Sequence, residues 1–129
     1  MSLRSPLGRV TGLGSAKDGT AHWWAQRVTA VALVPLTLWF VISLLSLPAL
    51  DYDTVYAWAS VPLTGFLSFL LVVVCAYHGY LGAVVIIEDY VTSKANKVIS
   101  LVLLRFVFVV FGGACAFAIL RIALGSSHL

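Results

Sequence analysis

PLTGFLSFLLVVVCAYHGYLGAVVII (residues 62–87) is an unbroken apolar run that determines the class of this protein. It contains no Asp, Glu, Lys or Arg. A helix of this length, rising about 1.5 Å per residue, can cross a hydrocarbon layer about 30 Å thick. Two further apolar stretches, residues 26–47 and 98–124, are also long enough to do so. The sequence therefore predicts an all-α integral membrane protein with three transmembrane helices.

The composition of the chain agrees with a lipid environment. Of its 129 residues, 61% are apolar and only 10% are charged, which is too little polar surface for a water-soluble domain of this size. We expect one membrane domain over residues 1–129, in which residues 1–25 form a cytoplasmic arm. Little chain remains for a soluble catalytic domain, so any large-scale chemistry must come from partner subunits.

The positive charges are distributed unevenly along the chain. The connection at residues 51–60 has no Lys or Arg, whereas basic residues gather before the first span and between the second and third: Arg4, Arg9, Lys17, Arg27, Lys94 and Lys97. By the positive-inside rule, we expect the N terminus to face inward and the C terminus outward. This topology accounts for the excess of basic residues, so no nucleic-acid partner is expected. Because the N-terminal arm lacks the apolar face of an organellar transit peptide, we expect the inner membrane of a bacterial cell rather than that of a mitochondrion.

Four polar side chains interrupt the apolar pattern: Arg27, His78, Asp89 and Arg105. Polar groups in lipid are costly, so they mark the places where function is expected. His78 lies about 15 Å from the inner end of its span at helical rise, near the middle of the bilayer. Three interpretations of it are open: a haem ligand, a structural histidine held by hydrogen bonds, or a member of a proton path.

The neighbours of His78 favour the haem interpretation. Asp89 follows eleven positions later, close to three helical turns, so the two side chains are expected on one face of the helix. Gly79 and Gly82 remove side chains beside the imidazole, which either admits a porphyrin or allows close helix packing. Since the spans contain no other histidine, the second axial ligand must come from another chain, or the iron is five-coordinate.

The two arginines also have alternative interpretations. Arg27, one turn inside the first span, is either an anchor that extends to the headgroups or a partner for a haem propionate or a quinone-site carboxylate. Arg105 lies deeper in the third span, so pairing with Asp89, Glu88 or a propionate competes with extension to the headgroups.

Asp89 and Tyr90 mark the end of the second span. An Asp-Tyr pair at a helix end is commonly an interfacial anchor. In a quinone pocket, the phenol would hydrogen-bond a quinone carbonyl and the carboxylate would relay protons from the aqueous side. His22, beside Trp23 and Trp24, is a weaker candidate for the lining of such a pocket.

The arrangement HGYLGAVVIIEDYV (residues 78–91) resembles the small membrane anchor, the D-type subunit, of succinate dehydrogenase. The stretch SPLGRVTGLGSAKDGTAHWWAQRVTAVAL (residues 5–33) is similar to bacterial members of that family, and the resemblance covers nearly the whole chain. It implies that the three spans form half of a heterodimeric helix bundle.

The resemblance also implies roles for individual residues. His78 matches an axial ligand of haem b, whose other ligand is a histidine of the larger cytochrome b anchor subunit. Tyr90 matches the tyrosine that hydrogen-bonds ubiquinone, and Asp89 matches the carboxylate beside it. Arg27 matches the arginine near the propionates and the quinone, whereas Arg105 has no assigned role.

In such a complex the flavoprotein and iron-sulfur subunits oxidise succinate and pass electrons to ubiquinone. This chain would dock them to the membrane and carry no dicarboxylate chemistry of its own. Two alternatives stay open at this point. One is the anchor of a fumarate reductase, and the other is a small three-helix membrane protein without redox function, which would bind no chromophore.

Overall fold

The structure is a computed structural model that describes residues 15–125 of the chain. Its helices are α2 (Ser15–Leu45), α3 (Tyr52–Ala59), α4 (Pro62–Tyr90) and α5 (Lys94–Ala123). The three long ones, α2, α4 and α5, are apolar and long enough to cross a membrane, and the described residues form no strand. The predicted all-α fold with three spans is confirmed.

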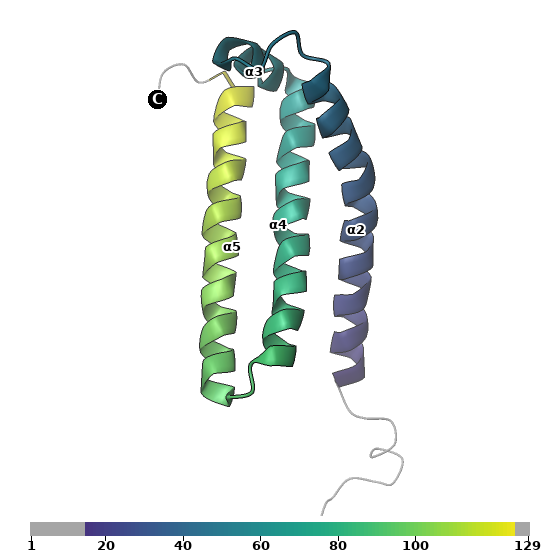
Figure 1. Ribbon diagram of the computed structural model, residues 1–129, viewed down its shortest axis with the longest axis vertical. Coiled ribbons are helices and arrows are strands. Elements are labelled where there is room, and N and C mark those ends of the chain that lie inside the picture. The colour runs from purple at the N-terminus through teal and green to yellow at the C-terminus, as the bar shows by residue number, and fades with distance from the viewer. Residues whose placement is uncertain (1–14, 126–129) are drawn as a thin grey trace, which may run out of the picture.

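The long helices form an open row rather than a closed bundle. Figure 1 shows α4 in the middle, with α2 on one side and α5 on the other. Among the described helices, α4 contacts both neighbours, and α2 and α5 do not contact each other. In Figure 1 the start of α2 and the α4–α5 turn lie at the lower end of the row, and α3 lies across the upper end. Every long helix therefore keeps a large part of its surface open.

Backbone chemistry sets the helix boundaries of α4. Pro62 occupies the first turn, where its missing N–H would have no partner in any case. The helix continues past the predicted end at residue 87 to Tyr90, and Val91 is extended. The turn that follows is closed by Lys97, whose Nζ donates a hydrogen bond to the Glu88 carbonyl at 2.9 Å. Asp89 and Tyr90 are therefore the last helical residues, held at a tight turn.

The other two spans also differ from their predicted bounds. α2 begins at Ser15, before the predicted start at residue 26, so part of the expected arm is helical. α5 begins at Lys94, before the predicted start at residue 98. Hydropathy marks where a helix enters lipid, whereas the helix itself continues for as long as its backbone hydrogen bonds are satisfied.

α3 is held by a cap at its start and by aromatic contacts to α2. The Asp51 carboxylate accepts a hydrogen bond from the Thr54 backbone N–H at 2.8 Å. Hydrogen bonding from Thr54 lowers the pKa of Asp51 because it favours the charged form. Trp58 stacks on Trp39 of α2, with ring centroids 6.1 Å apart, and Phe40 lies 5.9 Å from the same ring. α3 is thus fixed over the upper end of the row.

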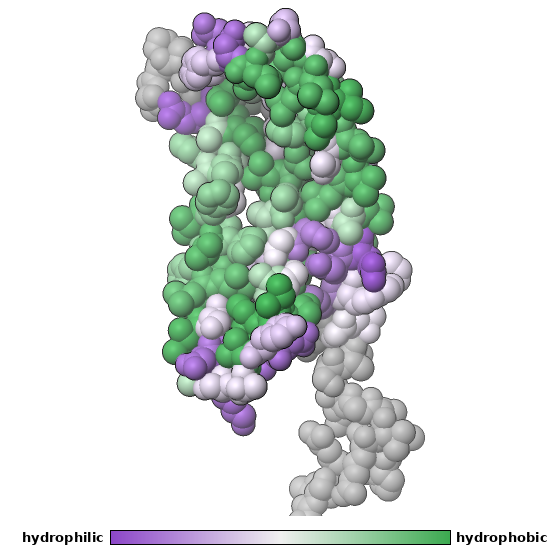
Figure 2. All heavy atoms as spheres, in the orientation of Figure 1, coloured by the Kyte–Doolittle hydropathy of each residue, from purple (hydrophilic) through white to green (hydrophobic). Residues whose placement is uncertain are grey.

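The interior of the chain is very small. In the described part, Leu36 and Leu81 are the only buried large apolar side chains, while Val31 and Phe111 are each 71% exposed. Figure 2 shows apolar residues covering the middle of the molecule, with hydrophilic residues at both ends and over the lower half of α2. Such a surface suits lipid and partner helices, not water.

α4 and α5 approach each other through small residues. A Cβ on Gly65 would lie 2.5 Å from the Ala123 Cβ, and one on Gly112 would lie 3.1 Å from the Ala76 Cβ. Within a bilayer, where no hydrophobic effect drives helices together, close backbone contact of this kind is a main source of association.

Candidate functional site

An open groove between α2 and α4 brings together polar side chains of both helices. The volume of the groove is about 590 Å³. The α2 side is lined by Gly19, His22, Trp23, Gln26, Arg27 and Ala30, and the α4 side by His78 and Val85. The fold therefore brings His78 and Arg27, far apart in sequence, to one site. His22, the weaker candidate from the sequence, lies there with them.

His78 is half-buried and is held from α2. Its Nδ1 lies 2.8 Å from the Thr29 hydroxyl oxygen. The same hydroxyl lies 2.7 Å from the Ala25 carbonyl oxygen and 3.1 Å from that of Gln26. Among the described residues, Nε2 of His78 has no hydrogen-bond partner. The ring is thus fixed at one nitrogen, and the other can accept a ligand.

The α2 side of the groove offers polar atoms without partners. His22 Nε2 and Gln26 Oε1 are buried and form no hydrogen bond with any described residue. A buried polar atom left unsatisfied costs about 1–3 kcal/mol, so such atoms are normally completed by water, a ligand or another chain. Arg27 is exposed, and its guanidinium carbon lies 5.6 Å from the centre of the Trp23 ring. The Arg27 cation can bind an anionic group such as a haem propionate, whereas Gln26 Oε1 only accepts hydrogen bonds and needs a donor from water, a ligand or another chain.

The two glycines beside His78 serve different neighbours. A Cβ on Gly79 would lie 3.1 Å from the Phe108 ring of α5, so this glycine allows helix packing. A Cβ on Gly82 would lie 3.7 Å from Gln26 Nε2, on the side of the groove. Gly82 therefore faces α2, where the Gln26 side chain lies at ordinary contact distance from the space that its missing Cβ leaves.

Asp89 and Tyr90 are not part of the groove. Both are exposed at the C-terminal end of α4, and Tyr90 is 82% exposed. Asp89 continues the helical face of His78, as expected, but it lies beyond Val85, the last α4 residue that lines the groove. The two residues instead form a separate polar tip at the lower end of the row.

Arg105 lies between α4 and α5, where it lines a cavity together with Tyr80 and Glu88. Its guanidinium donates a hydrogen bond to the Tyr80 hydroxyl at 3.3 Å and lies 6.0 Å from the centre of that ring. Arg105 itself forms no ion pair with a carboxylate of the described residues. Arg105 does not line the groove that contains His78, and its pairing with a propionate stays a prediction.

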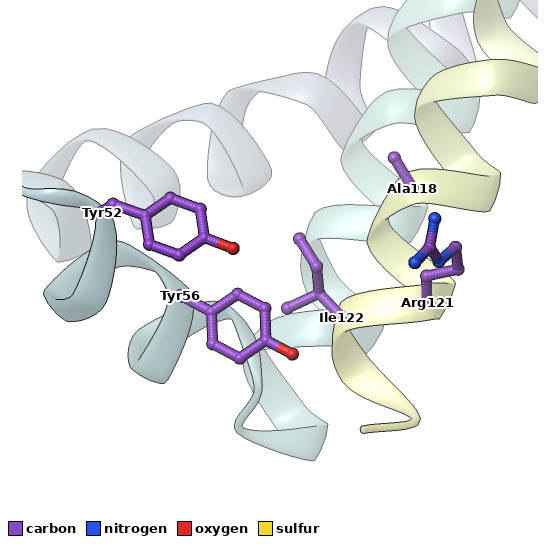
Figure 3. A pocket seen from close by; sticks show the side chains of 5 residues that line it. All are labelled: Tyr52, Tyr56, Ala118, Arg121 and Ile122. Atoms are coloured by element: carbon purple, nitrogen blue, oxygen red, sulfur yellow. The ribbon is translucent and has the colours of Figure 1, made fainter. Parts of the chain in front are cut away.

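A smaller pocket of about 280 Å³ lies at the upper end, between α3 and α5. Figure 3 shows the Tyr52 and Tyr56 rings directed from α3 toward α5, where Arg121 and Ile122 complete the lining. It is at the opposite end of the row from the Asp89–Tyr90 tip, and it contains no histidine. It therefore takes no part in the site around His78.

Comparison with known proteins identifies the family. A family model described as the succinate dehydrogenase/fumarate reductase transmembrane subunit matches residues 1–114. The succinate dehydrogenase hydrophobic membrane anchor subunit of Paracoccus denitrificans is 32% identical over 126 residues, which cover 98% of this chain and 97% of that protein. The chain belongs to the succinate dehydrogenase membrane anchor family.

Further relatives of this anchor agree. The anchor subunit of Rickettsia bellii is 32% identical over 92 residues, covering 71% of this chain and 74% of that protein. The succinate dehydrogenase membrane anchor subunit of Reclinomonas americana is 30% identical over 92 residues, which cover 69% of this chain and 77% of that protein. No solved structure matches significantly. The resemblance inferred from the sequence is confirmed, and the anchor is a multi-pass membrane protein of a family whose members are subunits of an enzyme complex.

Two residues near His78 were not singled out from the sequence: Gln26, which lines the anchor's groove, and Thr29, which contacts the imidazole. A signal for them was present. His22, Gln26 and Thr29 follow one another at steps of four and three, so they lie on one face of α2 and form a polar stripe at helical spacing. What the sequence could not provide was the packing of this stripe against His78.

Proposed function

We propose that this anchor forms half of a haem b site and one wall of a ubiquinone site in a succinate:ubiquinone oxidoreductase. The observation that supports the haem site is the half-buried His78, held at Nδ1 by Thr29, in a groove with Arg27 and two buried polar atoms without partners. The names of the relatives favour succinate dehydrogenase over fumarate reductase.

Each groove residue has a definite task in this proposal. Nε2 of His78 would be one axial ligand, and the larger cytochrome b anchor subunit would provide the other. The Arg27 guanidinium would hold a propionate by charge-assisted hydrogen bonds. When bound, the haem supplies a one-electron carrier whose potential is set by its axial ligands and by nearby charge.

The ubiquinone site would be built at the polar tip of α4. The Tyr90 hydroxyl would donate a hydrogen bond to a quinone carbonyl and stabilise the negative charge that develops on that oxygen. The Asp89 carboxylate would take protons from the adjacent water and deliver them toward the same oxygen. Because both side chains are exposed in this chain, neighbouring subunits would form the other walls.

The arrangement of the helices supports the proposed partners and orientation. The open face of the row leaves the groove accessible to a second anchor subunit. Lys94 and Lys97 lie at the lower end, as does the start of α2. By the positive-inside rule this end would face the bacterial cytoplasm, with the iron-sulfur and flavoprotein subunits docked beneath it and the C terminus outside.

The proposal is tested by isolating the assembly from its native membrane through an affinity tag on this chain. We expect a flavin-bearing companion to copurify and the preparation to show a b-type reduced-minus-oxidised difference spectrum. An assembly without flavin and without this spectrum would contradict the proposed function and leave a three-helix membrane protein without redox chemistry.

Arg27→Leu is expected to weaken haem retention and to lower the haem potential. A positive charge near the iron disfavours the ferric state, so its removal shifts the potential downward, on the order of 50 mV for one charge at an effective dielectric constant of about 20. Redox titration of the purified assembly measures this shift. Arg105→Leu, on the far side of α4, serves as the matched control. Unchanged haem content, potential and quinone turnover in Arg27→Leu would leave Arg27 only an anchoring role.

A further inference from the structure

We infer that Thr29 is a positioning residue for His78. Its hydroxyl accepts a hydrogen bond from the Nδ1–H of the imidazole, and this fixes the tautomer in which Nε2 carries a free lone pair. The functional meaning of this inference rests on the proposed haem site. Its evidence is the set of three short contacts around one oxygen atom of α2.

The argument begins with the single proton of the Thr29 hydroxyl. The oxygen lies 2.7 Å from the Ala25 carbonyl oxygen and 3.1 Å from that of Gln26. Carbonyl oxygens only accept hydrogen bonds, so each of these contacts requires the hydroxyl proton. The Ala25 carbonyl can only accept, whereas His78 Nδ1 can donate in one tautomer, so both short contacts are hydrogen bonds only if the hydroxyl proton goes to Ala25, a back-bond that threonine commonly makes within a helix.

The third contact must then run in the opposite direction. The Thr29 oxygen lies 2.8 Å from His78 Nδ1 and has lone pairs left after donating to Ala25. Two acceptors without a proton between them would repel each other at this distance, so Nδ1 carries the proton. In a neutral imidazole only one nitrogen is protonated, so Nε2 has the free lone pair that a metal ligand needs.

The resulting chain of bonds runs from His78 through Thr29 to the Ala25 carbonyl. Histidines that ligate metals usually donate their other ring N–H to an acceptor, which orients the ring and increases its basicity. Here the acceptor is a hydroxyl whose own proton is already engaged, and it belongs to a different helix from the histidine. The register of α2 against α4 would thus set both the orientation and the donor strength of the ligand.

The test compares Thr29→Val with Thr29→Ser in the tagged assembly. Val keeps the branched shape and removes the acceptor, whereas Ser keeps the hydroxyl. We expect Thr29→Val to weaken haem retention roughly 10- to 100-fold, the usual effect of removing a partner behind a ligating histidine. The haem potential should rise, because a less basic imidazole stabilises the ferric state less well. Thr29→Ser should behave like the wild type, as should Thr37→Val, which makes the same change at an exposed position of α2.

The outcomes separate this inference from the proposed function. If wild-type haem depends on His78 but Thr29→Val changes neither retention nor potential, the role of Thr29 is refuted and the haem site stands. If the assembly carries no haem, the proposed haem site is refuted, and the tautomer of His78 is then decided by the imidazole resonances described next. Should Thr29→Val not assemble, imidazole nitrogen-15 resonances of the haem-free full-length chain in phospholipid vesicles still decide the matter. Protonation of His78 at Nδ1 supports the inference, and protonation at Nε2 overturns it.

Discussion

Replacement of His78 by Ala should abolish the b-type absorption of the purified assembly while the flavoprotein and iron-sulfur subunits stay bound. The imidazole is the only histidine side chain that α4 contributes to the groove, and alanine cannot ligate iron. The helix itself should survive, because alanine is the best helix former and His78 is only half-buried. The measurement is a reduced-minus-oxidised difference spectrum, with subunit content read from the same preparation.

A matched control for this change is His22→Ala. His22 lies in the same groove, on α2, so its replacement removes an imidazole without removing the proposed ligand. We expect the absorption band to persist in His22→Ala. A band that persists equally in His78→Ala would exclude His78 as the ligand, whereas the loss of both the band and the companion subunits would show that His78 acts on assembly.

Tyr90→Phe should slow electron transfer from succinate to ubiquinone roughly 10- to 100-fold, the effect of losing one hydrogen bond to a group that becomes charged. Succinate oxidation by a soluble artificial acceptor should stay unchanged, because that acceptor does not need the quinone site. Phenylalanine keeps the ring and removes only the hydroxyl. Since Tyr90 is 82% exposed within this chain, we expect no effect on its fold.

The ratio of the two activities is the informative quantity for Tyr90. Tyr77→Phe makes the same chemical change on α4 at a side chain that is 48% exposed and lies outside the α4 tip. It should leave both activities unchanged. Equal losses in the two assays for Tyr90→Phe would contradict a role in quinone binding and indicate a defect in the coupling of the subunits.

The fold was predictable because lipid imposes a simple rule on sequence. A span must be predominantly apolar over about 20 residues, so the charge-free run at residues 62–87 identified a helix without any knowledge of its neighbours. The ends were less predictable. Hydropathy ends the second span at Ile87, but no backbone feature stops the helix until Val91 becomes extended. This difference placed Asp89 and Tyr90 in the helix rather than in a connection.

The site was less accessible from sequence, because it depends on how the helices face one another. Helical spacing grouped Asp89 with His78, but only the packing of α2 against α4 shows that the groove ends at Val85. Pairing with a carboxylate was one expectation for Arg105. The side chain instead contacts the Tyr80 hydroxyl and ring, and only the register of α4 against α5 reveals this neighbour. Thr29 was missed for the same reason, since its contact with His78 joins two helices.

The open row of α2, α4 and α5, with no contact between its outer helices, has a consequence for how the cell maintains this protein. A newly inserted copy exposes its groove and the open sides of its helices until a companion covers them. We expect membrane quality control to recognise such a copy as unfinished and to degrade it. We therefore expect the steady-state amount of this chain to follow the supply of the subunit that completes it, so that synthesis in excess does not produce accumulation.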